Sequence, residues 1–162
     1  FSKSDDVLLE SVLEWYNEDK NRVDHFLSVV KRRNGMSLRV VDWLVTNFSK
    51  THSVMIDCGG MTRDLNREYQ RNLSAYNKRN LDPFARKNKI TVLLYGQEKR
   101  STTVGQLNFF RWFFKSDIGS ILDKYKDVVK AHMESCENKE KKIKKYNVAS
   151  TKSYTGRFVM VF

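Results

Sequence analysis

The sequence predicts an α+β fold, a mostly helical single domain with a small sheet of about three short strands. Its 162 residues are about the length of one domain, and 40% are hydrophobic, which suffices for a core. Apolar residues recur at helical spacing along most of the chain, whereas β-rich runs of strand length are few. We expect a single globular domain over 1–162, either processed or the ordered part of a longer chain, because it begins at Phe1 rather than Met.

The first half of the chain predicts four helices, because apolar residues repeat every three or four positions between polar caps and breakers. These helices cover residues 4–16, 20–33, 37–48 and 63–78. Asn34-Gly35 ends the second, since this pair favours a positive φ, and Pro83 follows the fourth. Between the third and the fourth helix, the run 53–57 precedes Gly59-Gly60 and predicts a strand that ends in a turn.

The second half predicts two further strands and two helices. Residues 90–95 and 157–162 are β-rich runs of strand length. Thr103 opens a helix with capping-box spacing, and this helix is aromatic on several faces, so we expect it in the centre of the core. Four of its side chains should be largely buried: Leu107, Phe110, Trp112 and Phe114. A last helix begins at Ser116-Asp117 and ends in the Lys/Glu-rich run 139–145.

The predicted helix over 63–78 has two opposite faces. Its apolar residues fall on one side of a helical wheel, and its basic residues fall on nearly the other side. The apolar residues are Leu65, Tyr69, Leu73 and Tyr76, and the basic residues are Arg63, Arg67, Arg71 and Lys78. We therefore expect one outward basic stripe, whose removal leaves folding almost unaffected.

The formal net charge of +11 lies entirely in the last hundred residues. Residues 1–62 carry 8 Lys/Arg against 9 Asp/Glu, whereas residues 63–162 carry 22 against 10. Such an excess attracts nucleic acid, anionic membrane surfaces or acidic protein faces, although a charged surface also serves solubility alone. The candidate residues for contact with a polyanion or partner are Arg63, Arg67, Arg71, Lys78, Arg86, Lys87, Lys89, Lys141, Lys142, Lys144 and Lys145.

The sequence contains no catalytic or metal-binding motif. It has no glycine-rich phosphate loop, and its Cys and His residues do not pair at zinc-ligand spacing. His132 and Cys136 lie four residues apart on one predicted helix, which makes at most half of a metal site. Cys58 near His52 is better explained as a small buried residue than as a nucleophile. We expect no enzyme activity, no catalytic or metal-binding residue, and no cofactor.

Three stretches are distinctive together, namely residues 37–48 (SLRVVDWLVTNF), 81–86 (LDPFAR) and 103–112 (TVGQLNFFRW). In this order they resemble an uncharacterised protein family of nucleocytoplasmic large DNA viruses, including algal and amoebal giant viruses. The resemblance covers about residues 5–150. It implies a viral protein made in the cytoplasm or nucleus of a host cell, in agreement with two Cys residues that need no disulfide. It implies neither an activity nor residues with a known role.

Two functions fit these observations. The first is a non-enzymatic structural component of a large DNA virus particle, such as a minor capsid or internal virion protein, which contacts other virion proteins. The alternative is a basic nucleic-acid-binding protein in viral genome packaging or transcription, and the basic faces suit an anionic membrane surface as well. We expect no small-molecule substrate. The expected location is the virion, and the host cytoplasm or nucleus during assembly.

Overall fold

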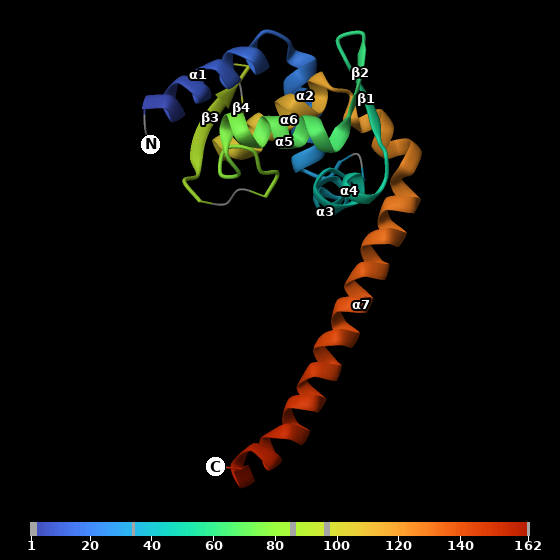
Figure 1. Cartoon of the computed structure of the whole chain (residues 1–162). Helices are drawn as coiled ribbons and strands as arrows, with labels where there is room; N and C mark the ends of the chain where they lie inside the picture. The colour runs from blue at the N-terminus through green and yellow to red at the C-terminus, as the bar shows by residue number, and fades with distance from the viewer. Residues whose placement is uncertain (1–2, 34, 85–86, 96–97, 162) are drawn as a thin grey trace. The chain divides into compact units, whose positions relative to one another are not determined.

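The computed structural model describes residues 3–33, 35–84, 87–95 and 98–161. Its helices are α1 (Lys3–Asn17), α2 (Lys20–Val30), α3 (Leu38–Trp43), the π-helical η1 (Leu44–Phe48), α4 (Ser49–Thr51), α5 (Leu65–Tyr76), α6 (Val104–Lys115) and α7 (Ile118–Val161) (Figure 1). Its strands are β1 (Met55–Cys58), β2 (Met61–Asp64), β3 (Ile90–Leu94) and β4 (Glu98–Thr102). Helices predominate, which confirms the predicted α+β class.

The chain divides into two compact units, Phe1–Lys126 and Asp127–Phe162. The first unit contains every helix and strand that precedes α7, together with the start of α7. The second unit contains the remainder of α7. The organisation as a single globular domain stays a prediction.

Helix α6 lies at the centre of the core of the first unit. Leu107 and Phe110 are fully buried, and the ring of Phe110 meets that of Phe26 on α2 edge-on, with centroids 6.1 Å apart. Helices α1 and α2 pack against α6, and Tyr69 of α5 contacts Trp112 of α6 (Figure 1). The predicted burial is confirmed for Leu107, Phe110 and Trp112. Phe114, near the end of the helix, is only half-buried, so the prediction was wrong for this residue.

Helix α5 is shorter than the predicted helix at both ends. Asp64 accepts a hydrogen bond from the backbone N–H of Arg67 at 3.0 Å, so this cap starts the helix at Leu65. Asn77 follows the last turn with a φ of 64°, a left-handed conformation that Asn tolerates better than most residues. Lys78 therefore lies beyond the helix on which it was predicted.

The four strands form two separate antiparallel hairpins rather than one sheet of three strands. β1 pairs with β2 across Gly59-Gly60, where both residues have a positive φ, and β3 pairs with β4. Neither β2 nor β4 was predicted, because neither strand has the alternating apolar residues that reveal a strand in a sequence. Both are held by backbone hydrogen bonds to a more apolar neighbour.

Helix α7 is helical through Val161, so the strand predicted over 157–162 is wrong for residues 157–161. Phe162 lies outside the described residues. Extending a helix that already exists adds one hydrogen bond for each residue that is fixed, whereas a strand needs a partner strand. A β-rich run at the end of a long helix can therefore continue that helix.

The third predicted helix continues beyond its expected end, through the π-helical turn η1 into α4. At this turn the N–H of Ser49 bonds to the carbonyl of Leu44, five residues back. The carbonyl of Val45, which would accept that N–H in a regular α-helix, instead accepts a hydrogen bond from the Ser49 hydroxyl at 2.7 Å. The side chain of Ser49 thus compensates for the wider turn.

Candidate anion-binding surfaces and a polar cavity

The basic residues predicted on one helical stripe do not form one. Arg63 lies on β2, and its Nη1 is 3.1 Å from Oε1 of Glu68. Nη1 of Arg71, on α5, lies 3.3 Å from the same oxygen. The Glu68 side chain is only 14% exposed, and its one carboxylate pairs with both arginines, which leaves the three side chains with a net charge of +1. Arg67 is exposed and forms no ion pair with any residue that the structure describes.

Lys78 packs against the protein instead of extending the row of arginines. Its ammonium donates to the Tyr69 hydroxyl at 3.3 Å and lies 4.0 Å from Oδ1 of Asp42. Burial alone lowers the pKa of Lys78, but the hydrogen bond to Tyr69 and the carboxylates of Asp82 and Asp42 outweigh burial and raise it. Burial raises the pKa of Asp42, whose Oδ1 is buried without a hydrogen-bond partner among the described residues.

Two of the predicted contact residues, Lys87 and Lys89, lie in the loop that leads into β3. Lys87 and Lys89 are exposed there, and Arg86 lies outside the described residues. Lys87 borders a cavity of about 20 Å³. Asp5 and Arg79 also border it, and they form an ion pair of 3.2 Å. The space is that of a single water molecule, so we do not place a ligand in it.

The predicted contact residues Lys141, Lys142, Lys144 and Lys145 lie on α7, in the second unit. Every side chain from residue 138 to residue 147 is exposed. The run 139–145 contains five Lys residues and one Glu, among them the predicted Lys141, Lys142, Lys144 and Lys145. Ile143 and Tyr146 are 59% and 72% exposed, and their three-residue spacing places them on the same side of the helix. Basic and large apolar side chains are thus presented together.

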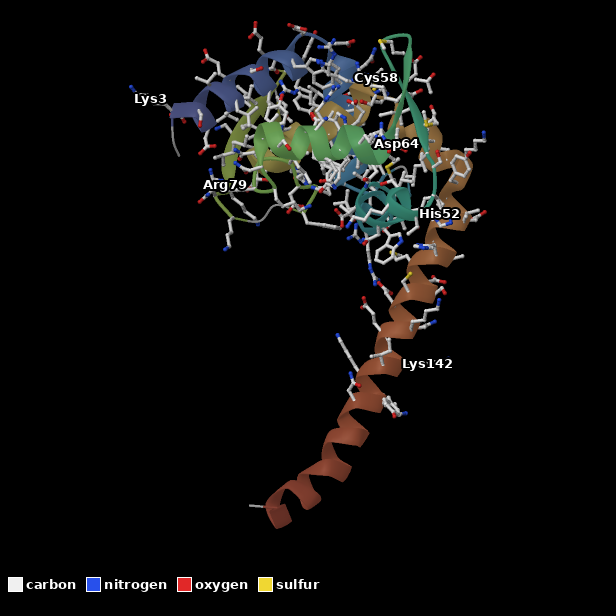
Figure 2. All side chains as sticks on the ribbon, in the orientation of Figure 1. Lys3, His52, Cys58, Asp64, Arg79 and Lys142 are labelled. Atoms are coloured by element: carbon white, nitrogen blue, oxygen red, sulfur yellow. The ribbon has the colours of Figure 1, made fainter. Side chains whose placement is uncertain are left out.

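A polar cavity of about 440 Å³ lies within the first unit, and none of the predicted contact residues lines it. Its walls come from α1, the β1–β2 turn, α5 and α6. Figure 2 shows Cys58 of the hairpin above the start of α5, which Asp64 marks. The polar lining consists mainly of Glu68, Asn72, Asn108, Arg111, Lys115 and Ser116. Each wall supplies only a few residues from a distant part of the sequence, so no linear motif signals the cavity.

Two neutral side chains hold Arg111 at this cavity. Its Nη1 donates to Oγ of Ser11 at 3.1 Å, and its Nη2 donates to Oδ1 of Asn108 at 2.8 Å. Asn108 is 1% exposed and donates to the carbonyl of Asn80 at 2.8 Å, so its own position is fixed. Lys115 follows one turn later on α6 and is exposed. Neither cation forms an ion pair with a carboxylate of the described residues.

Cys58 lines the cavity, and its surroundings raise the pKa of its thiol. Burial raises the pKa of this thiol and the Glu68 carboxylate raises it further, while Arg63 lowers it to a smaller extent. A raised pKa reduces the fraction of thiolate, which is the reactive form. His52, the nearest His in the sequence, stacks on Phe48 with ring centroids 4.1 Å apart. The surroundings of Cys58 favour the protonated, unreactive form.

Two other kinds of site lack support in the part of the chain that the structure describes. No three His, Cys, Asp or Glu side chains come together there as metal ligands. Nε2 of His132 and Sγ of Cys136 are 3.9 Å apart on α7, but zinc sites use three or four protein ligands. Over the same residues, no helix combines the length and the hydrophobicity that a membrane crossing requires.

Comparison with known proteins gives a viral relative but no described activity. A family model described as a family of unknown function (DUF7197) matches residues 1–157. The chain is similar to an uncharacterized protein of Acanthamoeba polyphaga mimivirus, with 27% identity over 153 residues. This match covers 88% of the chain but only 59% of the mimivirus protein, so the chain spans about three fifths of its relative's length. No solved structure matches. The matches agree with the resemblance to an uncharacterised family of giant viruses.

Proposed function

This chain belongs to the DUF7197 family, and from that premise we propose that it is a non-enzymatic structural component of a large DNA virus particle. Its role is that of a minor capsid or internal virion protein that binds other virion proteins. It is located in the virion, and in the host cytoplasm or nucleus during assembly. The similarity to a mimivirus protein supports the viral setting.

The exposed segment of α7 from residue 138 to residue 147 carries this proposal. A helix that is exposed on all sides gains no stability from packing, so such a segment suits a surface that a partner covers. Lys side chains surround Ile143 and Tyr146, which are the two most exposed large apolar residues of this segment. A partner with acidic residues around an apolar patch would complement both features.

The arrangement on α5 favours a protein partner over nucleic acid. Binding of a phosphate backbone depends on cations that are available to phosphates, because affinity follows the number of phosphates that are neutralised. Arg63 and Arg71 share the single Glu68 carboxylate, and Lys78 contacts Asp42 and Tyr69. Three of the four cations of the expected basic row therefore already interact with polar groups of the protein, which reduces the positive charge that this row offers to phosphates.

The experiment is to follow the protein through fractionated virions. We expect it in the shell or internal protein layer rather than in the core with the genome. Four substitutions to Gln, at Lys141, Lys142, Lys144 and Lys145, should reduce its incorporation into particles several-fold without lowering its free energy of unfolding, since exposed charges contribute little to stability. A matched control replaces four exposed lysines elsewhere with Gln: Lys20, Lys50, Lys99 and Lys126.

Nucleic-acid binding in packaging or transcription is the second candidate, because the lysines of α7 and Arg67 stay available to phosphates. It predicts co-purification with the genome core, and affinity for duplex DNA that falls steeply with salt concentration. If the protein binds DNA in this way, and the α7 substitutions abolish the binding while the control substitutions do not, nucleic-acid binding replaces the structural proposal. The structural proposal is also contradicted if the α7 variant and the control variant are incorporated into particles equally well.

A further inference from the structure

We propose that the 440 Å³ cavity of the first unit binds a small phosphate monoester of the mononucleotide class. This inference is independent of the proposed function, because none of the residues on α7 that carry that proposal lines the cavity. No such ligand was expected from the sequence. Three features of the cavity support it: its charge, the fixed position of Arg111 and the space that remains beyond a phosphate group.

The charge of the cavity favours an anion. Arg111 and Lys115 are its two cationic residues, and Glu68 is its one carboxylate among the described residues. Arg63 and Arg71 already neutralise Glu68, at 3.1 and 3.3 Å. The positive charges of Arg111 and Lys115 therefore have no carboxylate to offset them within the cavity. A bound anion would supply that charge in a partly desolvated space, where the interaction is stronger than in water.

Arg111 is positioned before any ligand arrives. Ser11 and Asn108 accept one N–H from each of its terminal nitrogens, at 3.1 and 2.8 Å, and Asn108 is itself bonded to the carbonyl of Asn80. Each terminal nitrogen retains a second N–H, and this fork matches two oxygens of a phosphate. Lys115, one helical turn away and about 6 Å along the axis, lies within reach of the same group. Two cations suit a phosphate dianion better than a single carboxylate.

The cavity is larger than a phosphate group needs, so its ligand has a second part. Tyr76 and Trp112 supply aromatic surface to the lining. The Asn72 amide donates to the backbone carbonyl of Glu68 at 2.8 Å, which leaves its own oxygen to accept a hydrogen bond from a ligand amine or hydroxyl. Aromatic surface, an amide acceptor and a cationic end are the features that bind a base, a sugar and a phosphate.

A free mononucleotide and the phosphorylated end of a nucleic-acid strand share this chemistry. The test is isothermal titration of the full chain with AMP, adenosine, inorganic phosphate, and a short single-stranded oligonucleotide with or without a 5′-phosphate. We expect AMP to bind at least 10-fold more tightly than adenosine and than inorganic phosphate. If the 5′-phosphorylated oligonucleotide binds as tightly as AMP, and the unphosphorylated one does not, the strand end is the source. If only AMP binds, the source is a free nucleotide.

Variants separate this cavity from general attraction to a basic protein. Lys115→Gln changes an exposed residue and should weaken AMP binding several-fold without altering the fold. Arg111→Gln should weaken it at least 10-fold, with its folding checked by circular dichroism because Arg111 also bonds to Ser11. Lys50→Gln, at an exposed residue outside the cavity, is the control and should leave AMP binding unchanged. The proposal is overturned if AMP binds no better than adenosine, or if Lys50→Gln weakens binding as much as Lys115→Gln does.

Discussion

At the scale of single residues, this protein buries charge in two different ways. Glu68 is shielded but meets two arginines, so its charge is compensated. Asp42 has a buried oxygen without a hydrogen bond among the described residues, and its nearest cation, Lys78, is 4.0 Å away and more than half exposed. A buried carboxylate oxygen without a donor carries a desolvation cost, which makes Asp42 a source of instability.

Asp42→Asn should therefore stabilise the protein by about 1 kcal/mol at pH 7. Burial raises the pKa of Asp42 in the folded state, so the folded protein favours the protonated carboxyl. As pH rises through this raised pKa, Asp42 becomes charged in the folded protein and lowers the free energy of unfolding. Below the ordinary pKa of about 4, Asp42 is protonated in both states, so the gain should shrink towards zero. Urea unfolding at pH 7 and below about pH 4 measures the difference in free energy of unfolding between variant and wild type. The control is Asp24→Asn, at an exposed residue. A loss of stability at pH 7 would show that the charge of Asp42 is compensated after all.

The Cys58 thiol should react slowly with an alkylating reagent in the folded protein. Burial and the Glu68 carboxylate raise its pKa, so less of the thiolate is present at a given pH than in the unfolded chain. The measurement compares alkylation rates of native and urea-unfolded protein from pH 7 to 10, in a Cys136→Ser background. A native rate above the unfolded rate would identify an activated thiol and reopen the question of catalysis.

Residue patterns revealed the buried aromatic residues but not their polar neighbours. Phe110 and Trp112 were predictable because large apolar side chains in one helix leave solvent wherever a core exists. The pairing of Arg63 and Arg71 with Glu68 was not predictable, because a helical wheel that starts at Arg63 assumes that this residue lies in the helix. The Asp64 cap places Arg63 on a strand instead. A capping residue three positions before Arg67 was the signal that could have revealed this.

At the scale of elements, α6 determines the core of the first unit and α5 connects its surface to that core. Tyr69 on α5 packs 6.0 Å from Trp112 on α6, measured between ring centroids. Glu68 of α5 lines the cavity and pairs with the more exposed Arg71 three residues later. The approximate positions of α1, α2, α5 and α6 were predictable from apolar spacing. The hairpins were predictable only in part, since β2 and β4 are short, polar strands that depend on their partners.

Phe110→Ala should lower the free energy of unfolding by about 3 to 5 kcal/mol, as aromatic truncations in cores do. Phe110 is fully buried, and its ring contacts Phe26 and Phe113 with centroids 6.1 and 5.6 Å away, so a cavity would remain. Denaturant titration gives the value. Phe84→Ala, at a residue that is 36% exposed, is the matched control and should cost less than about 1 kcal/mol. A cost below 1 kcal/mol for Phe110 would place it outside the core.

Replacing Arg63 and Arg71 together with Gln should cost about 1 kcal/mol, whereas Arg67→Gln should cost almost nothing. From the sequence alone, we expected almost no loss of stability from replacing any of these arginines. The difference arises because Glu68, only 14% exposed, would lose both cations that compensate it. Urea titration of the double variant and of Arg67→Gln measures both values. If adding Glu68→Gln to the double variant did not restore the free energy of unfolding, the loss of stability would not come from the uncompensated Glu68 carboxylate.

At the scale of the whole molecule, positive charge lies in both units, but its setting differs. In Phe1–Lys126 several basic residues are paired with carboxylates or aromatic rings, as Arg22 is with Glu18 and Trp15. In Asp127–Phe162 the lysines between 139 and 145 are exposed along a helix. Composition predicted the excess of charge but not how much of it is neutralised, because neutralisation depends on contacts between elements.

Hydrogen exchange should distinguish the two units although both are helical. Backbone amides from 138 to 147 lack packing around them, so their helix opens at little cost and they should exchange within seconds to minutes. Amides from 107 to 113 on α6 should be protected for far longer, since their side chains are buried. Exchange followed by mass spectrometry at two protein concentrations measures this. Strong protection of 138–147 at both concentrations would mean that the segment is already covered.

In the π-helical turn η1, the number of residues, rather than their type, determines the direction of the chain that follows. Such a turn holds one residue more than an α-helical turn, so losing one residue there would yield a regular helix. Everything after it would rotate by about 100° about the helix axis. β1 starts only a few residues later and leads to the hairpin that forms one wall of the cavity. A one-residue insertion or deletion between Leu44 and Phe48 would thus re-aim that wall without changing a single residue in it.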